Sequence, residues 1–493
     1  MPHRRAASFQ VRETESEPRK PGRWPEWLGL VLLAVVVRAL VGLDWILVTA
    51  DSPSFVSLAF DFLRGDVSDP RLGTIRLPAY PAFLSLFPAS GLGSPGAIVA
   101  AQSLLGIVSS VAAWWVARRL SSRRVALAVG AALALHPALI AFEHALMSET
   151  LALLLGLGSC VFLVRAVERR SAAESFVAGV LAAATLLTRL NLLPLVAVAL
   201  ALALRSERLD PDPEPRRRLG MRVAALAGLA LCLVPWATLV WRSHGVPSIF
   251  GGGASLRLAN AMEVGLVPPE RMESEFGAPA PGVVSPASFY LREMATRGAE
   301  GNRIARRILG SALRERPAEF ATAAARSALV APGWYWQTAN PLWREIPSWL
   351  EEGRMASNGQ PSRARQRLAE LLPRGDDVWT VAPATGWFGI CSTSALVVAR
   401  GALLTLAVIA LLLSWPRPSG TERARQTLFA ALLVYALLAI LCGASFAMRE
   451  RFADPLDGVA VAAGVAAIEL LAGRFRGRAV MASEAATGDG ASS

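Results

Sequence analysis

The chain has 493 residues, of which 53% are hydrophobic and 18% are charged, against roughly 25% charged residues in an average soluble domain. This composition excludes an intrinsically disordered chain, a collagen-like fibre and a small disulfide-stapled domain, and it disfavours an ordinary soluble enzyme because the apolar residues lie in long runs. The formal net charge is +12, but the arginines gather at the ends of the apolar runs, which is typical of a polytopic membrane protein rather than of a nucleic-acid-binding protein.

Ten apolar runs predict the membrane part of the chain, because a spanning helix needs about 20 mostly apolar residues. The runs lie at 27–48, 95–117, 125–142, 147–164, 174–188, 190–204, 223–241, 394–413, 427–445 and 456–472. The fifth and sixth runs are short, so they could be partial spans that meet near Arg189 and Asn191. The predicted fold class is an all-α polytopic membrane protein with about 10 transmembrane helices (range roughly 9–12), outer-face juxtamembrane helices and a mainly helical extracytoplasmic domain.

The first run has two interpretations. Val48-Thr49-Ala50 resembles the small-residue cleavage site of a signal peptide. We favour a retained anchor, because the run is longer than a signal core and contains Arg38 and Asp44. Arg38 is then expected to pair with Asp44 or with a carboxylate inside the bundle rather than to contact substrate.

The arginine distribution predicts the orientation. Segments assigned to the cytosol hold 25 basic residues, whereas the short outer loops hold six. The long segment 242–393 is assigned to the outer side, because long loops are translocated largely regardless of charge. The predicted parts are a cytosolic tail 1–26, a membrane domain 27–241 with the outer loop 51–77, an extracytoplasmic domain 242–393, membrane helices 394–472 and a cytosolic tail 473–493. They describe a multi-pass protein of a bacterial-type inner or plasma membrane with both termini in the cytosol.

Further helices are expected on the outer side. Segment 78–92 is apolar, short and broken by prolines, which is typical of a re-entrant or interfacial helix. Pro286 and Pro317 predict helix starts, since proline is favoured at the first helical position. An apolar stripe at 304–313, opposed by arginines, is either a helix at the membrane surface or a solvated helix of the extracytoplasmic domain.

Ionisable residues gather at the predicted outer face. They are Asp51, Asp61, Asp66, Asp69, Arg76, Glu143, His144, Glu149, Arg189, Arg242, Arg449, Glu450 and Arg451. Such groups are costly at membrane depth and commonly mark a site or a pathway. The set suits a lipid-linked phosphosugar, because arginine binds phosphate through paired donors and a carboxylate can deprotonate an acceptor hydroxyl. No P-loop, HExxH or CxxC motif is present.

Simpler roles are open at each position. Asp51 could be a solvated boundary residue, Arg76 an interfacial anchor and Glu149 a first-turn helix residue. His136, which precedes Pro137, is expected to be a packed or capping residue rather than a metal ligand.

Several short motifs follow one another in a specific order. They are Asp51 after the first run, Arg76-Leu77-Pro78-Ala79-Tyr80-Pro81, Ser148-Glu149-Thr150, Thr188-Arg189-Leu190-Asn191, Pro235-Trp236 with Arg242, and Glu450-Arg451-Phe452 with Pro455. In this order they resemble the integral-membrane glycosyltransferases of the C-type fold, which include protein O-mannosyltransferase-like, lipid A aminoarabinose transferase and lipopolysaccharide galacturonosyltransferase-like proteins. One departure is that Ser52 follows Asp51, where many relatives have an acidic pair.

The resemblance implies an inverting transfer of a sugar from a polyprenyl-phosphate donor to a lipid, glycan or protein acceptor on the non-cytoplasmic face. The implied catalytic residues are Asp51, which acts as the base, and Glu149. The implied donor phosphate-binding residues are Arg76, Arg189 and Arg451. The implied substrate-binding residues are Tyr80, His144 and Asn191. Membrane lipid is an expected partner and nucleic acid is not. No cofactor or metal is expected, since a polyprenyl-phosphate donor lacks the diphosphate that commonly recruits a divalent ion.

Two other functions stay open. A transporter or flippase for a lipid-linked or anionic solute would use the same arginines as a pathway, but transporters typically show internal repeats and midplane polar sites, and no repeat is visible here. A scaffold subunit would bind a partner through segment 242–393, and only the ordered motifs argue against it.

Overall fold

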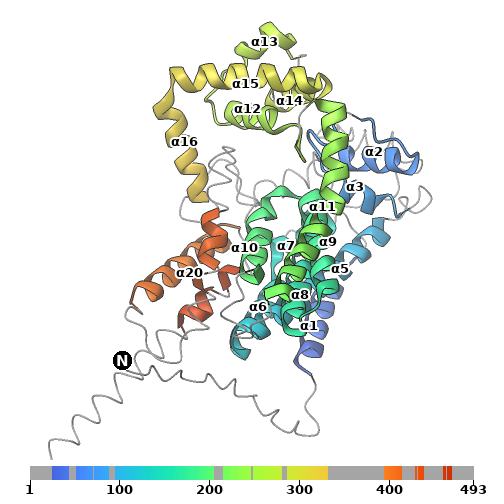
Figure 1. The fold of residues 1–493 in the computed structure, drawn as a ribbon. Helices are drawn as coiled ribbons and strands as arrows, with labels where there is room; N and C mark the ends of the chain where they lie inside the picture. Colours follow the sequence, from blue (N-terminus) through green and yellow to red (C-terminus); the bar gives the residue numbers. More distant parts are fainter. Residues whose placement is uncertain are drawn as a thin grey trace, which may run out of the picture.

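The computed structural model describes residues 25–43, 51–69, 71–87, 95–204, 215–245, 248–279, 286–330 and 393–413, with short pieces at 428–429, 431–437, 459–461 and 463–468. These residues are almost entirely helical, and the β pairing among them is limited to an isolated bridge between Leu72 and Arg76. A bundle of long helices forms the larger part, and a smaller group of helices lies at one end of it (Figure 1). The predicted all-α class is confirmed for the described part of the chain.

The bundle helices follow the predicted apolar runs. They are α1 (Glu26–Val41), α5 (Pro95–Leu120), α6 (Arg123–Leu135), α7 (Pro137–His144), α8 (Glu149–Arg169), α9 (Ala172–Thr188), η1 (Leu190–Leu192), α10 (Leu193–Leu204), α11 (Pro215–His244) and α20 (Thr393–Leu413). The single turn η1 separates α9 from α10, where the two short runs are expected to meet. The first run is helical to Val41, and Asp44 lies outside the described residues.

Three described helices are long and apolar enough to cross a bilayer: Gly96–Arg119, Glu149–Arg169 and Leu219–His244. The bent pair Arg123–Leu135 and Pro137–His144 would make a fourth. Shorter apolar helices, including α9, add to the bundle. The chain is therefore a membrane protein, while a count of about ten spans stays a prediction.

Small residues let two bundle helices approach closely. Gly179 of α9 faces the backbone of α11, and Gly228 of α11 faces the backbone of α9, so a side chain at either glycine would collide with the facing helix. Such contacts are typical of helices that pack within a bilayer, where van der Waals contact drives association. Several large apolar side chains of α11 stay exposed, as expected for a lipid-facing surface: Leu219, Val223, Leu226, Leu231 and Val234.

The fourth candidate span is bent by 44° between α6 and α7. Pro137 begins α7 and disfavours the helical conformation at His136, which is extended. Nδ1 of His136 accepts a hydrogen bond from the Leu139 amide at 3.4 Å, so His136 is a buried capping residue, as predicted. All eight residues of α7 are buried. Glu143, which is predicted at the outer interface, is therefore inside the bundle.

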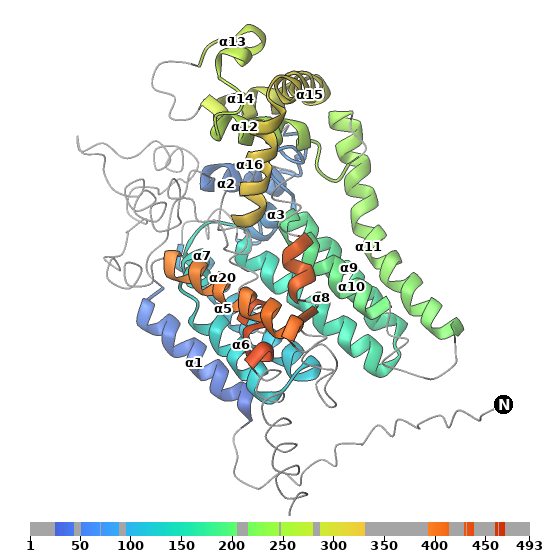
Figure 2. The ribbon, with the colours of Figure 1, turned by 90° about the vertical axis from the view of Figure 1, so that its left-hand side faces the viewer.

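Two short helices, α2 (Ser52–Leu63) and α3 (Ala79–Leu84), lie between the bundle and the smaller group of helices (Figure 2). The outer loop predicted at 51–77 is helical in its first half, which forms α2. The reason is an apolar side at helical spacing, which is buried and consists of Phe55, Val56, Leu58 and Ala59. Helix α3 agrees with the short helix predicted within 78–92.

Five further helices, called the outer helices below, form the smaller group. They are α12 (Gly253–Glu263), α13 (Glu270–Phe276), α14 (Pro286–Thr296), α15 (Gly298–Glu315) and α16 (Pro317–Val330). Pro286 and Pro317 begin α14 and α16, as predicted. Ile304 and Ile308 of α15 are buried in one apolar cluster with α12 and α14. The burial of Ile304 and Ile308 favours the interpretation of 304–313 as a helix of the extracytoplasmic domain, whereas Leu313 stays exposed.

The side of the membrane on which the outer helices lie is testable at two exposed positions, Thr296 of α14 and Arg217 at the far end of α11. A membrane-impermeant maleimide should label Thr296→Cys in sealed cells and leave Arg217→Cys at the level of the native cysteines. Permeabilised cells should label both variants equally. Labelling of Arg217→Cys alone in sealed cells would reverse the predicted orientation and place Asp51 on the cytosolic side.

Candidate functional site

Asp51 and Arg76 come from different elements and form an ion pair at the end of the bundle that carries the outer helices. Arg76 Nε also donates to Ser54 Oγ at 2.8 Å, and the guanidinium carbon lies 4.7 Å from the centre of the Phe55 ring. Ser54 Oγ donates in turn to the Asp51 backbone carbonyl at 2.7 Å. The side chains of Asp51 and Arg76 keep 31% and 18% of their surface exposed, so a ligand can reach both.

A tight turn at residues 71–76, called the arginine turn below, positions Arg76. The amides of Ile75 and Arg76 both donate to the Arg71 carbonyl, at 2.9 and 3.0 Å. The Gly73 amide donates to the Arg76 carbonyl at 2.7 Å, with a φ of 83° that glycine adopts without strain. The turn rests on a small apolar cluster from α2, the turn itself and α11, which includes Leu58, Leu72, Trp236 and Val240.

The other three aspartates of segment 51–77 have partners close by in sequence. The partners are Arg64 for Asp61, Ser68 for Asp66 and Arg71 for Asp69. Partial burial opposes ionisation of Asp69, but hydrogen bonds from Arg71 and its positive charge outweigh that effect and lower the pKa of Asp69. Asp51 differs from these residues in pairing with the arginine that the resemblance assigns to the donor phosphate.

A second ion pair joins Glu149, the first residue of α8, to Arg189, which follows α9. The distance from Arg189 Nη1 to Glu149 Oε1 is 2.6 Å, and Nη1 also donates to Ser148 Oγ at 3.3 Å. The Glu149 side chain has no exposed surface, and a buried carboxylate requires such a partner. Asn191 lies in η1 and is half-buried. The chain thus brings two of its predicted site residues, Glu149 and Arg189, into contact.

Tyr80 of α3 lies between the two ion pairs. Its ring is edge-on to Phe55, with the ring centres 4.9 Å apart, and its hydroxyl donates to Gln102 Oε1 at 2.9 Å. Full burial raises the pKa of the Tyr80 phenol well above its usual range, and the nearby Glu149 carboxylate adds to that effect. Tyr80 therefore stays a neutral hydrogen-bond donor, and in this conformation it lies behind the accessible surface of the site.

Gln102 of α5 is a site residue that the sequence interpretation missed. Its Nε2 donates to the backbone carbonyls of Glu143 and Ala145, at 2.8 and 3.0 Å. His144, between those two residues, is also fully buried. Gln102 thus fixes the segment that leads into Glu149. In the sequence, Gln102 could have been recognised as an amide side chain within an otherwise apolar run.

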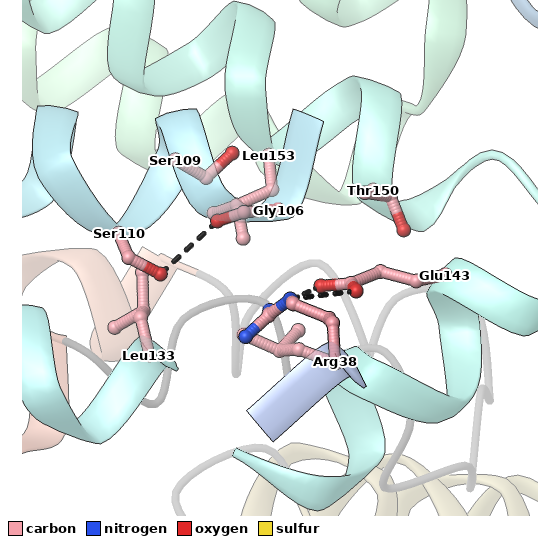
Figure 3. A pocket seen from close by; sticks show the side chains of 9 residues that line it. Arg38, Gly106, Ser109, Ser110, Leu133, Glu143, Thr150 and Leu153 are labelled. Carbon is pink, nitrogen blue, oxygen red and sulfur yellow. Dashed lines mark hydrogen bonds and ion pairs between the residues drawn. The ribbon is translucent and has the colours of Figure 1, made fainter. Parts of the chain in front are cut away.

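Arg38 of α1 pairs with Glu143 of α7 inside the bundle (Figure 3). Its Nε and Nη2 donate to the Glu143 carboxylate at 3.0 and 2.5 Å, and its Nη1 donates to the carbonyls of Ala34 and Ala134 at 3.3 and 2.7 Å. Gly106 permits this arrangement, because a Cβ there would occupy the place of the carboxylate. The expected pairing of Arg38 with a carboxylate inside the bundle is confirmed.

A small cavity lies beside this buried pair. Besides Arg38 and Glu143, polar side chains of Ser109, Ser110 and Thr150 line it (Figure 3). It has room for about one water molecule, which is too little for a sugar. The cavity therefore belongs to the interior of the bundle and is not a substrate site.

The structure does not bring several residues of the predicted outer-face set into contact with the two ion pairs. Arg451, with Arg449 and Glu450, lies outside the described residues. Arg242 is exposed near the end of α11. Within the described ranges, no group of three or more His, Cys, Asp or Glu side chains is arranged to hold a metal ion. The expectation of a site without metal stays a prediction.

The apolar bundle and the ionisable groups at one of its ends define a class: an integral membrane protein with a polar site at the end of its bundle. Residues 78–241, about a third of the chain, match the family model described as dolichyl-phosphate-mannose-protein mannosyltransferase. This match confirms the predicted resemblance over that segment and indicates membrane glycosyltransferase activity in general terms. The matched segment contains Tyr80, Glu149 and Arg189 and begins two residues after Arg76. No curated protein and no solved structure matches the chain.

Proposed function

We propose that the protein transfers a sugar from a polyprenyl-phosphate donor to a lipid, glycan or protein acceptor on the non-cytoplasmic face of the membrane, with inversion at the anomeric carbon. The observation that carries the proposal is the contact between Asp51 and Arg76. A group that can take a proton and a group that can bind phosphate lie side by side, partly exposed, at the end of an apolar bundle.

The proposed chemistry uses each partner of that ion pair separately. The Arg76 guanidinium donates paired hydrogen bonds to the donor phosphate and stabilises the charge that grows on it as the bond to the sugar breaks. Asp51 takes the proton of the acceptor hydroxyl while the hydroxyl oxygen forms the new bond to the anomeric carbon. Polyprenyl phosphate leaves from the opposite face of the sugar, so the configuration inverts.

The second ion pair supports the first in this proposal. Glu149 is fully buried and orients Arg189, which would extend the phosphate-binding surface together with Arg451. Asn191, which is half-buried, would contact the sugar, with the buried His144 and Tyr80 behind it. Glu149 would therefore position the sugar or the acceptor rather than take the proton.

The transport alternative has less support from the bundle interior. A solute path through the membrane needs polar groups that are available to the solute. The Arg38 guanidinium, in contrast, is occupied by Glu143 and by two backbone carbonyls.

The direct experiment is to purify the full chain, extract the lipids that accompany it and identify any lipid-linked sugar by mass spectrometry. That donor is then incubated with the protein and candidate acceptors. Formation of free polyprenyl phosphate together with an inverted glycosidic product would support the proposal, whereas movement of an intact lipid-linked sugar across vesicles without transfer would favour the alternative.

Arg76→Ala should weaken the binding of undecaprenyl phosphate, used as a probe for the phosphate and lipid tail, by about tenfold or more, because charge-assisted hydrogen bonds contribute about 1.5–3 kcal/mol each. Arg76→Lys should restore part of the affinity, since lysine keeps the charge but not the planar pair of donors. Affinity is measured by quenching of the intrinsic tryptophan fluorescence of the purified protein.

The matched control is Arg64→Ala. Arg64 lies in the same segment, and its ion pair with Asp61 is at the surface, with 71% of the Arg64 side chain exposed. Arg64→Ala should leave probe affinity unchanged. Equal affinities of Arg76→Ala and Arg64→Ala would reduce Arg76 to an interfacial anchor.

A further inference from the structure

The first outer helix begins in direct contact with the arginine turn. The Gly251 amide donates to the Gly73 carbonyl at 2.6 Å. Gly252 lies so close to Thr74 that a Cβ on Gly252 would overlap the Thr74 carbonyl. Both contacts join backbone to backbone, so no flexible side chain can absorb a displacement of either segment.

The end of α11 holds the same turn from a second side. His244 is buried, and its Nε2 lies 3.1 Å from the Leu72 carbonyl oxygen. Trp236 Nε1 donates to the Ile249 carbonyl at 2.9 Å, so Ile249, two residues before Gly251, is bonded to α11. The upper end of α11 lies beside the outer helices in both views (Figures 1 and 2).

Asn302 of α15 joins Gly251 to the outer helices by hydrogen bonds. Its Nδ2 donates to the Gly251 carbonyl, and its Oδ1 accepts from Ser255 Oγ of α12 at 3.2 Å. Asn302 is 2% exposed, and a buried amide whose donor and acceptor are both satisfied is costly to disturb. The backbone amide of Gly251 is thus bonded to the arginine turn, and its backbone carbonyl is bonded to Asn302 of α15.

We infer that the outer helices set the position of Arg76, and that Gly252 and Asn302 are positioning residues for donor-phosphate binding. The inference rests on the proposed role of Arg76. Arg76 ends the turn whose carbonyls at Leu72 and Gly73 receive these contacts. Paired hydrogen bonds to phosphate require a fixed guanidinium orientation, so a turn released from the outer helices binds phosphate less well.

The test compares two adjacent glycines. Gly252→Ala forces a methyl group against Thr74, whereas Gly253→Ala adds a methyl group that meets nothing within 4 Å. Gly252→Ala should weaken the affinity for undecaprenyl phosphate by about tenfold, since a displaced Arg76 guanidinium loses a charge-assisted hydrogen bond to the phosphate. Gly253→Ala should bind as the unaltered protein does. Amide hydrogen exchange of residues 71–77 should rise in Gly252→Ala and stay unchanged in Gly253→Ala.

Asn302→Asp provides a second variant that keeps the shape of the side chain. It keeps the acceptor for Ser255 but removes the hydrogen bond donated to Gly251, so exchange of the arginine turn should rise here too. A double variant separates positioning from general destabilisation. If Gly252 acts through Arg76, then adding Gly252→Ala to Arg76→Ala should cause no further loss of affinity.

The outcomes distinguish the inference from the proposed function. Lower affinity in Arg76→Ala with unchanged affinity in both Gly252→Ala and Asn302→Asp would overturn the inference alone. A full additional loss in the double variant would also overturn it. Unchanged affinity in Arg76→Ala would overturn the proposed role of Arg76 and the inference together. Lower affinity and faster exchange in Gly252→Ala, with neither in Gly253→Ala, would support the inference.

Discussion

Asp51→Asn should transfer sugar about 10²–10⁴ times more slowly than the unaltered protein, because general base catalysis contributes a factor of that size. Asparagine has nearly the same shape and can still accept a hydrogen bond from Arg76, so the fold should persist. Affinity for undecaprenyl phosphate should be equal or higher, since the Asp51 carboxylate no longer competes with phosphate for the guanidinium. Transfer rates are measured with purified protein, a defined donor and a defined acceptor.

Two further variants test whether the loss of transfer is specific to Asp51. Asp61→Asn changes an aspartate of the same segment that pairs with the exposed Arg64, and it should leave the transfer rate unchanged. Glu149→Gln should lose less activity than Asp51→Asn, because a carboxylate that orients Arg189 does not take the proton. A transfer rate close to that of the unaltered protein in Asp51→Asn would refute the assignment, and Glu149 and then Asp61 would become the candidates.

Arg38→Ala should destabilise the protein by about 3–5 kcal/mol, because removing one member of a buried ion pair leaves an uncompensated charge. The charge left without a partner is that of Glu143, which has no exposed surface and receives two hydrogen bonds from Arg38. The measurement is thermal unfolding of the purified protein in detergent. The double variant Arg38→Met/Glu143→Gln should be more stable than Arg38→Ala, since neither residue then carries a charge.

The control for this prediction is Arg119→Ala. Arg119 pairs with Glu168 at the exposed ends of α5 and α8, and an exposed ion pair contributes about 0–1 kcal/mol. Arg119→Ala should therefore unfold at nearly the same temperature as the unaltered protein. An equal loss of stability in Arg38→Ala and Arg119→Ala would show that the buried ion pair contributes no more to the stability of the fold than the exposed one.

The helices of the bundle could be predicted because they depend on local pattern. Apolar runs predict α5, α8 and α11, and the position of His136 before Pro137 predicts a packed or capping residue, whereas the bend at this point was not predicted because run 125–142 reads as one span. Segment 51–77 was harder, since its aspartates suggest a loop although the apolar residues of α2 recur at helical spacing.

Contacts between distant residues could not be predicted from pattern alone. Arg38 and Glu143 are 105 positions apart, and nothing local shows that the bend before α7 turns Glu143 inward. The pairing of Asp51 with Arg76 follows from how α2, the arginine turn and α11 pack together. The resemblance named both residues as parts of one site, but it did not predict that they contact each other.

The length of α11 has a consequence for how the site meets its substrate. Thirty residues at about 1.5 Å per residue make a rod of about 45 Å, whereas the hydrocarbon layer of a bilayer is about 30 Å thick. A helix longer than the hydrocarbon layer can tilt or extend beyond it, and Trp236 and His244 near the C-terminal end of α11 contact the arginine turn. On the proposed function, α11 would hold Arg76 at a fixed height relative to the membrane core. A polyprenyl phosphate carries its headgroup at the same height whatever the number of its isoprene units, so an arginine held at that height would bind the phosphate without contacting the far end of the tail.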